Sequence, residues 1–420
     1  MSDKSDTIRI ALGLNNCVDY EIQWDGSILE ALVVENNIYR RDVRRYSEVK
    51  SLRELICSLL YQMEVGEGIG CKVSDMDIVF EYADSFTFKK TLGGAGVRAA
   101  ITIRKFGYRS ILHLVSQSDD VRALLPEGCE YYCAVEHDAD YPHLIIQFPV
   151  DAEIRANDIR IVTKRANRVM YFNDEGIMTL PLTEEFFKAA GNCNTLLLGG
   201  FTSVSDPKRG MKQAIKAVEY INRHMKNAVI YYESSCPPDG IKPEHNEIWR
   251  RIMSVSHIYS INEDELQQHI GEKINLHDAA SVIAAIEKLS EIIPCDNYVI
   301  HTKYWALMYG KNASSCLVPL QYAVDISTTR LLYGDEMTAK ELNNDIRNRP
   351  YDPEGLAFKK QLEQGRWKRD VICVPSYLVN EKNVVTIGLG DSFVGGFIAK
   401  LSDALADSLV GRADFHPTPS

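Results

Sequence analysis

Long hydrophobic runs are missing from this sequence. No apolar stretch approaches the length of a membrane span, and the first residues, Met1 to Thr7, are polar rather than an apolar signal segment. We therefore expect no membrane partner and a cytoplasmic protein. The 420 residues are enough for a large core and for more than one domain.

Cysteine is present but not organised. The ten cysteines are scattered, and the closest pair, Cys129 and Cys133, has no CxxC spacing and no matching histidine pattern. These spacings argue against zinc sites and against a disulfide framework. Reduced thiols in a cytoplasmic protein are the simplest interpretation.

Basic residues are outnumbered. The chain has 47 Lys and Arg against 58 Asp and Glu, a net charge of −11. Such a balance argues against a surface that coats nucleic acid, although a local basic site remains possible. A cluster of Lys164, Arg165 and Arg168 is either such a site, able to hold a phosphate, or a solvated edge.

From Thr179 onward, apolar strand-like runs alternate with helical patterns. The expected strands cover 195–200, 228–232, 258–261 and 297–300, and the expected helices cover 183–190, 211–225, 245–254 and 277–292. A first strand is expected at 8–14. This alternation predicts an α/β fold with a central, mostly parallel sheet flanked by helices.

Two sections interrupt this alternation. Residues from about 20 to 90 contain strand-like pieces around one clear helix, and residues from about 131 to 178 contain two strands with no good helix between them. Antiparallel pairing suits the second section, because parallel pairing needs a long crossover. The first section is consistent with an insertion into the main sheet.

Polar residues collect where the expected parallel strands end. Glu233 closes one strand, Asn262 and Glu265 follow the next, and His301 and Thr302 follow a third. The carboxyl ends of parallel strands lie on one edge of the sheet, where open α/β sheets bind ligands. The sequence therefore predicts a binding site there.

The stretch from Val384 to Phe397 predicts a strand, a glycine turn and a helix. Gly388, Leu389 and Gly390 form the turn, and Asp391 follows at the start of the helix. The free amides of a helix N-terminus favour an anion. Asp391 is then either a base beside an anion-binding turn or simply the helix cap.

Two further stretches have both a binding and a structural interpretation. Asn15 to Asp19 follow the first strand and either face a ligand or form an Asx turn. Gly93 and Gly94 open a small-residue helix and either let a ligand approach the backbone or serve tight packing.

Taken together, these residues resemble the ADP-dependent sugar kinases, the archaeal-type phosphofructokinase and glucokinase family of the ribokinase superfamily. The resemblance covers most of the chain and depends on motifs in a fixed order: Asn15…Asp19, Gly93-Gly94, His143 to Pro149, Asn167-Arg168, Tyr232-Glu233, Asn262-Glu263-x-Glu265, His301-Thr302 and Thr386-x-Gly388-Leu389-Gly390-Asp391.

The resemblance implies a Rossmann-like large domain, residues 1–18, 93–130 and 179–420. It also implies a smaller α/β lid inserted in two segments, 19–92 and 131–178. These segments match the two irregular sections above. Closure of the lid would exclude water from phosphoryl transfer.

The resemblance also implies roles for single residues. Asp391 would take the proton from a sugar hydroxyl, and the amides of Gly388, Leu389 and Gly390 would form the anion hole. The remaining implied roles are sugar contacts for Asn15, Asp19, Gly93, Gly94 and Arg168, nucleotide contacts for Asn262, His301, Thr302 and Gly390, and organisation of Mg²⁺ by Glu233 and Glu265.

The chain departs from the family at the first strand. The usual pattern is Asn-x-Asn-x-Asp, and here Cys17 stands in place of the second asparagine. One amide beside the sugar is thereby lost, which concerns the identity of the sugar more than the reaction. The base, the anion hole and the metal-side carboxylates remain.

The leading interpretation is a magnesium-dependent sugar kinase that uses ADP, releases AMP and takes part in glycolysis. Fructose 6-phosphate is the first candidate acceptor because of the basic cluster, and glucose is the second. One alternative is an ATP-dependent kinase of the ribokinase superfamily, which shares the glycine turn. Another is a non-catalytic regulatory protein that binds sugar and nucleotide. The sequence leaves the oligomeric state open.

Overall fold

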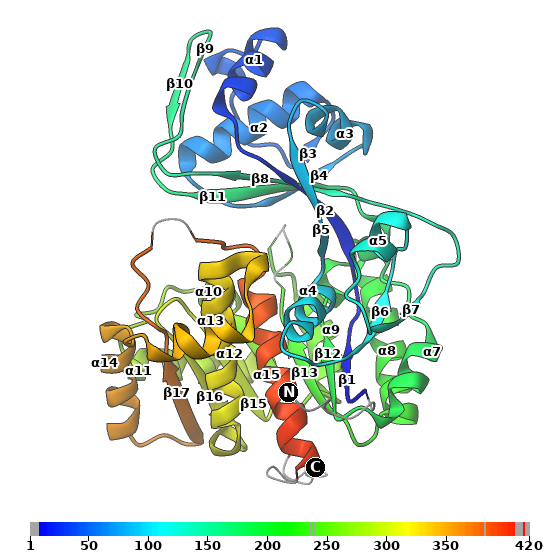
Figure 1. Cartoon of the computed structure of the whole chain (residues 1–420), viewed down its shortest axis with the longest axis vertical. Coiled ribbons are helices and arrows are strands. Elements are labelled where there is room, and N and C mark those ends of the chain that lie inside the picture. Colours follow the sequence, from blue (N-terminus) through cyan, green and yellow to red (C-terminus); the bar gives the residue numbers. More distant parts are fainter. Residues whose placement is uncertain (1–7, 236, 238–239, 382–383, 408–414, 416–420) are drawn as a thin grey trace.

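Two β-sheets organise the computed structural model, a large one in the lower part of Figure 1 and a small one in the upper part. The structure describes residues 8–235, 237, 240–381, 384–407 and 415. Within these residues, no helix combines the length and the apolar character needed to cross a bilayer.

The large sheet has nine strands. In spatial order they are β17 (Asp370–Pro375), β16 (Trp305–Gly310), β15 (Asn297–His301), β14 (Ile258–Asn262), β13 (Val229–Glu233), β12 (Thr195–Leu198), β1 (Ile10–Leu12), β6 (Ile111–Leu114) and β7 (Glu130–Cys133). Neighbours from β7 to β15 run parallel, and β16 and β17 add an antiparallel edge. The predicted, mostly parallel sheet is therefore confirmed.

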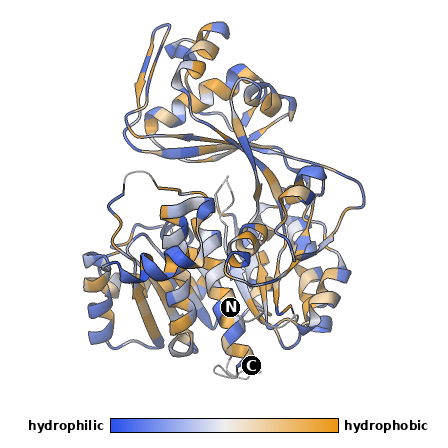
Figure 2. Ribbon diagram, in the orientation of Figure 1, coloured by the Kyte–Doolittle hydropathy of each residue, from blue (hydrophilic) through white to orange (hydrophobic). Residues whose placement is uncertain are grey.

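Helices cover both faces of the large sheet because its central strands are buried on both sides. One face packs on α4 (Ala95–Arg104), α12 (Leu317–Tyr333) and α15 (Leu389–Ala406). The other packs on α7 (Glu184–Ala189), α8 (Pro207–His224), α9 (Pro243–Met253), α10 (Glu263–Ile270), α11 (Ala279–Ile292) and α14 (Pro353–Gln364). The outer helices carry hydrophilic and hydrophobic residues along their length, as amphipathic helices do (Figure 2).

The small sheet has six strands. In spatial order they are β3 (Glu48–Val49), β4 (Gly70–Val73), β11 (Asn167–Phe172), β8 (His143–Phe148), β2 (Cys17–Ile22) and β5 (Phe88–Gly93). One face is covered by α1 (Gly26–Glu35), α2 (Leu52–Val65) and α3 (Asp77–Ala83). The hairpin of β9 (Glu153–Ala156) and β10 (Ile159–Val162) lies beside α1 and α2.

Side-chain alternation along β11 explains the two faces of the small sheet. Val169 and Tyr171 are buried, and the Tyr171 hydroxyl donates to the carbonyl of Leu55 in α2 at 3.3 Å. Alternate residues point to opposite faces of a strand. Arg168 and its alternating neighbours are thus left to face the large sheet.

Strands from both irregular sections meet in the small sheet. The predicted antiparallel pairing of the second section is confirmed by β8 and β11, in which Arg168 lies opposite Gln147. β7 pairs with β6 in the large sheet, although the predicted second lid segment begins at 131. The division into a body and a lid with the boundaries given above stays a prediction.

The predicted strand before the glycine turn is wrong. Val384 to Thr386 form no strand, and the amide of Val385 donates to the carbonyl of Leu331 in α12 at 2.8 Å. The segment lies along the end of α12, and the antiparallel strands β16 and β17 form that edge of the sheet instead. The β-branched run indicated a strand that tertiary packing did not use.

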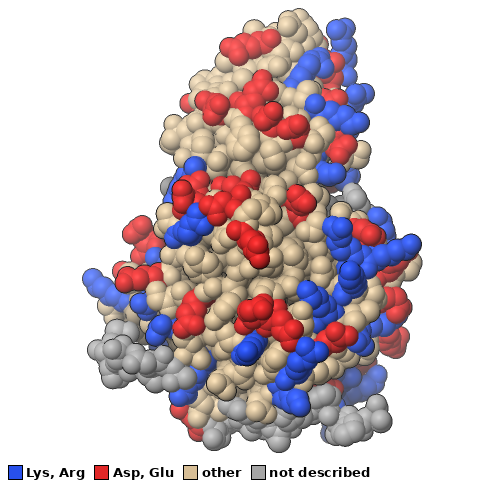
Figure 3. Space-filling view, turned by 90° about the vertical axis from the view of Figure 1, so that its right-hand side faces the viewer, with Lys and Arg blue, Asp and Glu red and all other residues tan. Residues whose placement is uncertain are grey.

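The surface carries charges of both signs, and the described cysteines form no disulfide. Figure 3 shows acidic and basic side chains interspersed over one face of the molecule. Nine cysteines are described and all are free thiols, while Cys236 lies outside the described residues.

Candidate active site

Asp391 lies in the first turn of α15. Gly388 is the N-cap and adopts φ 76°, a left-handed conformation that glycine reaches without strain. No side chain caps the helix, so Asp391 is not the cap. The first amides of a helix have no carbonyl partner within it. Asp391 therefore stands beside amides that are available to an anion.

A cavity of about 660 Å³ lies between the two sheets, in front of this turn. Many predicted site residues line it: Asn15, Gly94, Arg168, Glu233, Asn262, Glu265, His301, Gly388, Leu389, Gly390 and Asp391. His143, Met170 and Phe172 complete its wall from the small sheet. The cavity thus joins the anion-binding turn to the strand ends.

The ends of the parallel strands bring Glu233 and His301 together. The Glu233 Oε1 atom lies 3.3 Å from the His301 Nε2 atom. Burial raises the pKa of Glu233, and His301 offsets this only in part. Burial alone would lower the pKa of His301, but Glu233, Glu265 and Glu263 together outweigh it and the pKa is raised. The pair therefore favours holding one proton between its two members.

Asn262 and Glu265 hold the start of α10. The Asn262 side chain accepts hydrogen bonds from the amides of Asp264 at 3.0 Å and Glu265 at 2.9 Å. Glu265 accepts in return from the amide of Asn262 at 3.2 Å, which completes a capping box. Both residues line the cavity while they cap the helix.

A second cavity of about 580 Å³ adjoins the first. The two share His301, Thr386, Leu389 and Gly390. Its wall is largely apolar, with Val324, Leu331, Val379, Val384 and Phe393. Thr302 lines this second cavity, and its hydroxyl accepts from the amides of Tyr304 and Trp305, each at 3.1 Å.

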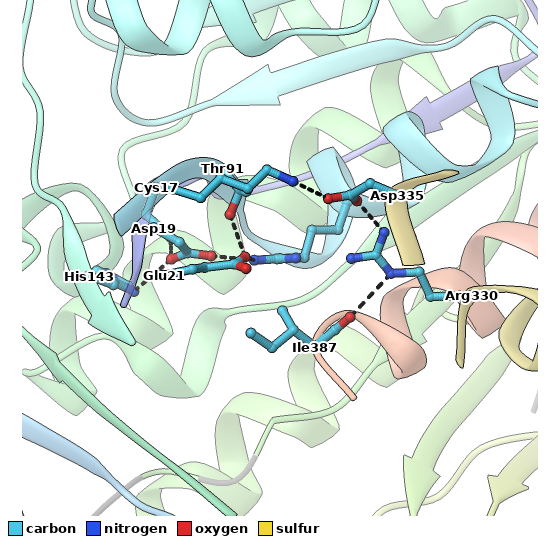
Figure 4. A network of polar contacts seen from close by, with 10 residues as sticks. Cys17, Asp19, Glu21, Thr91, His143, Arg330, Asp335 and Ile387 are labelled. Carbon is cyan, nitrogen blue, oxygen red and sulfur yellow. Dashed lines mark hydrogen bonds and ion pairs between the residues drawn. The ribbon is translucent and has the colours of Figure 1, made fainter. Parts of the chain in front are cut away.

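Asp19 and Gly93 do not line either cavity. The Asp19 carboxylate is buried, and its Oδ2 accepts from Arg98 at 2.5 Å (Figure 4). A Cβ at Gly93 would lie 2.4 Å from the Cys17 Sγ atom and 2.6 Å from the Asp19 Oδ2 atom. Gly93 is needed here for close packing against β2.

Gly94 has a positive φ and lies close to the backbone of Asn15. Its φ is 93°, and a Cβ would lie 2.5 Å from the carbonyl oxygen of Asn15. A larger residue would push Asn15 out of place. Asn15 lines the cavity, whereas its neighbour Asn16 is buried and its side-chain amide donates to the Ser116 carbonyl at 3.0 Å.

Arginines surround Asp391, and sequence reasoning missed two of them. Burial raises the pKa of Asp391, and the charges of Arg98, Arg168 and Arg330 oppose this without cancelling it. Burial disfavours the charge on Arg98, but Asp19 and Asp391 outweigh it and raise its pKa. Arg98 follows Gly94 by one helical turn, and nothing else in the sequence marks it.

The three basic residues of the predicted cluster are separated. Arg168 lines the large cavity, and its guanidinium has no hydrogen bond or ion pair with any residue that the structure describes. Arg165 donates instead to the carbonyl of Gly66 at 2.5 Å, and Lys164 is exposed. The predicted cluster is therefore reduced to Arg168 at the cavity.

One protein-family model matches nearly the whole chain. The family model described as the ADP-specific phosphofructokinase/glucokinase conserved region matches residues 8–398. No curated protein sequence matches the chain.

Solved structures share the fold. A hypothetical ADP-dependent phosphofructokinase from Pyrococcus horikoshii OT3 aligns with TM-score 0.76 at 15% identity, over 96% of this chain and 99% of that chain. A phosphofructokinase from the same organism with AMP aligns with TM-score 0.75 at 15% identity, over 96% of this chain and 100% of that chain. An ADP-dependent kinase in complex with fructose 6-phosphate and ADPβS aligns with TM-score 0.71 at 15% identity, over 94% of this chain and 93% of that chain.

Proposed function

Because the chain belongs to the ADP-specific phosphofructokinase/glucokinase family, we propose that this sugar kinase transfers the terminal phosphoryl group of ADP to fructose 6-phosphate and releases AMP. The observation that carries the proposal is the position of Asp391. It lies beside the free amides of α15, at the wall of a cavity large enough for a sugar and next to a second, more apolar cavity.

The geometry supports separate roles for the two cavities, the second for the adenine base and the first for the sugar. The apolar walls of the second cavity suit an adenine base. Gly390 lies where the cavities meet, and a Cβ there would have His301 Cε1 as its neighbour at 3.8 Å. The phosphates of a nucleotide bound there would pass over the turn toward Asp391.

Asp391 is suited to take the proton of the acceptor hydroxyl. Its raised pKa makes it a stronger base than an ordinary aspartate, and the charges of the arginines around it favour its ionised form. The amides of the turn and Arg168 would stabilise negative charge on the transferred group. Phosphoryl transfer needs mainly this positioning and charge neutralisation.

The acceptor is inferred from Arg168. A cavity-lining guanidinium without a carboxylate partner fits a phosphate group on the substrate. The ADP-dependent kinase of the same fold is in complex with fructose 6-phosphate and ADPβS. Glucose is the second candidate acceptor.

The residues at the strand ends fit a magnesium ion. Glu233 Oε2 is buried and has no hydrogen-bond partner among the described residues, and Glu265 lines the same cavity. Carboxylate oxygens and water are the ligands that Mg²⁺ prefers. Glu233 and Glu265 would hold the ion, which when bound neutralises charge on the nucleotide phosphates.

The proposal is tested by incubating the protein with ADP, Mg²⁺ and a panel of sugars and measuring AMP. We expect AMP to form fastest with fructose 6-phosphate. Turnover with ATP and none with ADP would contradict the donor, and faster turnover with glucose would contradict the acceptor. Binding of sugar and nucleotide without any turnover would favour a regulatory protein.

We expect the Glu233→Gln variant to need about tenfold more Mg²⁺ for half-maximal turnover. Glutamine keeps a side-chain oxygen near His301 but loses the charge that orients a hydrated ion. Turnover is measured against Mg²⁺ concentration, with Glu247→Gln on the exposed face of α9 as the control. Superimposable magnesium curves for Glu233→Gln and the unmodified protein would limit Glu233 to a structural role.

A further inference from the structure

Three side chains of different chemistry meet where two central strands of the small sheet begin. They are Cys17 of β2, His143 of β8 and Asp174, the N-cap of α6 (Glu175–Thr179). One possible ligand atom from each lies within 4.8 Å of the other two, and all three residues are buried. β2 and β8 are parallel neighbours with Asp19 opposite His143, so the sheet itself fixes this arrangement.

Asp19 supplies a ligand atom on the Nδ1 side of the His143 ring, opposite the Nε2 atom that Asp174 contacts. The Oδ1 atom of Asp19 lies 3.4 Å from the Cys17 Sγ atom and 3.8 Å from the His143 Nδ1 atom (Figure 4). In a tetrahedral zinc site, with bonds of about 2.3 Å to sulfur and about 2.0–2.1 Å to nitrogen and oxygen, ligand atoms are roughly 3.3–3.5 Å apart. The observed separations are close to these values.

Other contacts hold the carboxylates in position. Arg98 binds Oδ2 of Asp19 at 2.5 Å and leaves Oδ1 toward Cys17. The amide of Ile177 donates to Oδ1 of Asp174 at 2.8 Å, while Oδ2 lies 3.1 Å from the His143 Nε2 atom. Asp174 therefore holds the imidazole of His143 through Nε2, as an outer-shell carboxylate does in metal sites. Oδ1 of Asp19 is left on the Nδ1 side of the ring, near Cys17.

We propose that Cys17, Asp19 and the Nδ1 atom of His143 form a binding site for Zn²⁺ or a similar divalent transition metal, with Asp174 holding the imidazole through Nε2. Thiolate and imidazole ligands select such ions over Mg²⁺, which takes oxygen ligands. This site is therefore distinct from the one proposed at Glu233 and Glu265. Binding replaces the Cys17 thiol proton, which leaves to solvent.

The site has a consequence for catalysis that depends on the proposed function. His143 lines the cavity proposed for the sugar, and Asp19 lies directly behind it. A bound zinc ion would draw both toward itself. We therefore expect Zn²⁺ to compete with the sugar at metal concentrations that leave nucleotide binding unchanged.

The test uses Co²⁺ as a spectroscopic substitute for Zn²⁺ in the full-length protein. We expect a thiolate-to-cobalt charge-transfer band in the near ultraviolet and its loss when Zn²⁺ is added. The Cys17→Ser variant should lose this band, and its affinity for Zn²⁺, measured against a chromophoric chelator, should fall about 10- to 100-fold. Asp174→Asn should keep the band and bind more weakly.

The control is Cys129→Ser, a half-buried thiol on the large domain that bonds Ser110. It should keep both the band and the affinity. No band with the unmodified protein, or a band that survives in Cys17→Ser, would overturn the metal site. Thermal unfolding of each variant verifies folding, and Cys17→Asn replaces Cys17→Ser if the latter does not fold.

Kinetics separate this inference from the proposed function. If the band is present and Zn²⁺ does not affect the KM of the sugar, the metal site stands and the placement of the sugar beside Asp19 and His143 fails. If the sugar is phosphorylated and no band forms, the function stands and the metal site fails.

Discussion

The Asp391→Asn variant is expected to bind adenine nucleotide normally and to turn over about 10² to 10⁴ times more slowly. Asparagine has nearly the same shape but cannot accept the proton of the acceptor hydroxyl. The anion-binding amides of α15 belong to the backbone and remain in place. The loss should therefore fall on kcat, with little change in nucleotide affinity. Steady-state kinetics and a nucleotide titration measure the two quantities separately.

Stability measurements show whether this loss is a folding defect. Because burial raises the pKa of Asp391, its protonated form is favoured in the folded state. The associated stability is present at pH values below about 3.9, the ordinary aspartate pKa, and is lost as pH rises through the raised value. Asparagine is never charged, so the variant should unfold at a temperature at least as high as the unmodified protein at pH 8.

A second aspartate on the same helix is the matched control. Asp403 bonds the Tyr108 hydroxyl at 2.7 Å, far from the turn. Asp403→Asn should keep kcat and lose some stability. Turnover of Asp391→Asn at the unmodified rate would rule out Asp391 as the base.

The sequence predicted the mostly parallel large sheet and its helices, for a physical reason. Strands such as Thr195–Leu198 are buried on both faces and read as continuous apolar runs, so alternation with helices is visible. The family match confirms the predicted resemblance to the ADP-dependent sugar kinases, and the solved structures confirm the fold. β16 and β17 were not foreseen, because an antiparallel edge breaks the alternation.

Site residues at the ends of strands were predictable from the sequence. Site residues that reach the turn from a distant helix were not. Glu233 ends β13 and His301 ends β15, with only β14 between them in one parallel sheet, so both side chains lie at the same edge and can meet. Arg330 reaches the turn from α12, where its Nε donates to the carbonyl of Ile387 at 3.3 Å (Figure 4). No local pattern indicates such an approach.

The same limit explains the metal-ligand cluster. Cys17, His143 and Asp174 are far apart in sequence, so no spacing rule could find them, and the spacing of the cysteines argued against zinc sites of any kind. The small sheet brings them together by pairing β2 with β8.

The Arg168→Ala variant is expected to lose about 1.5–3 kcal/mol of transition-state binding for fructose 6-phosphate, which is roughly 10- to 150-fold in kcat/KM. The guanidinium lines the cavity without an acidic partner, so a substrate phosphate would be the group it binds. Glucose has no phosphate and should lose much less. The measurement is kcat/KM for both sugars in both proteins.

Arg165→Ala is the matched control, because Arg165 lies three residues away and donates to the carbonyl of Gly66 instead. Arg165→Ala should leave the ratio of kcat/KM for fructose 6-phosphate to kcat/KM for glucose unchanged. Removing Arg168 also removes a charge that lowers the pKa of Asp391, so the acid limb of turnover should move to higher pH for both sugars. Comparing the sugars above pH 8 separates that shared effect from phosphate binding. Equal losses for glucose and fructose 6-phosphate at that pH would show that Arg168 does not bind a substrate phosphate, and the reason for ranking the phosphorylated sugar first would be gone.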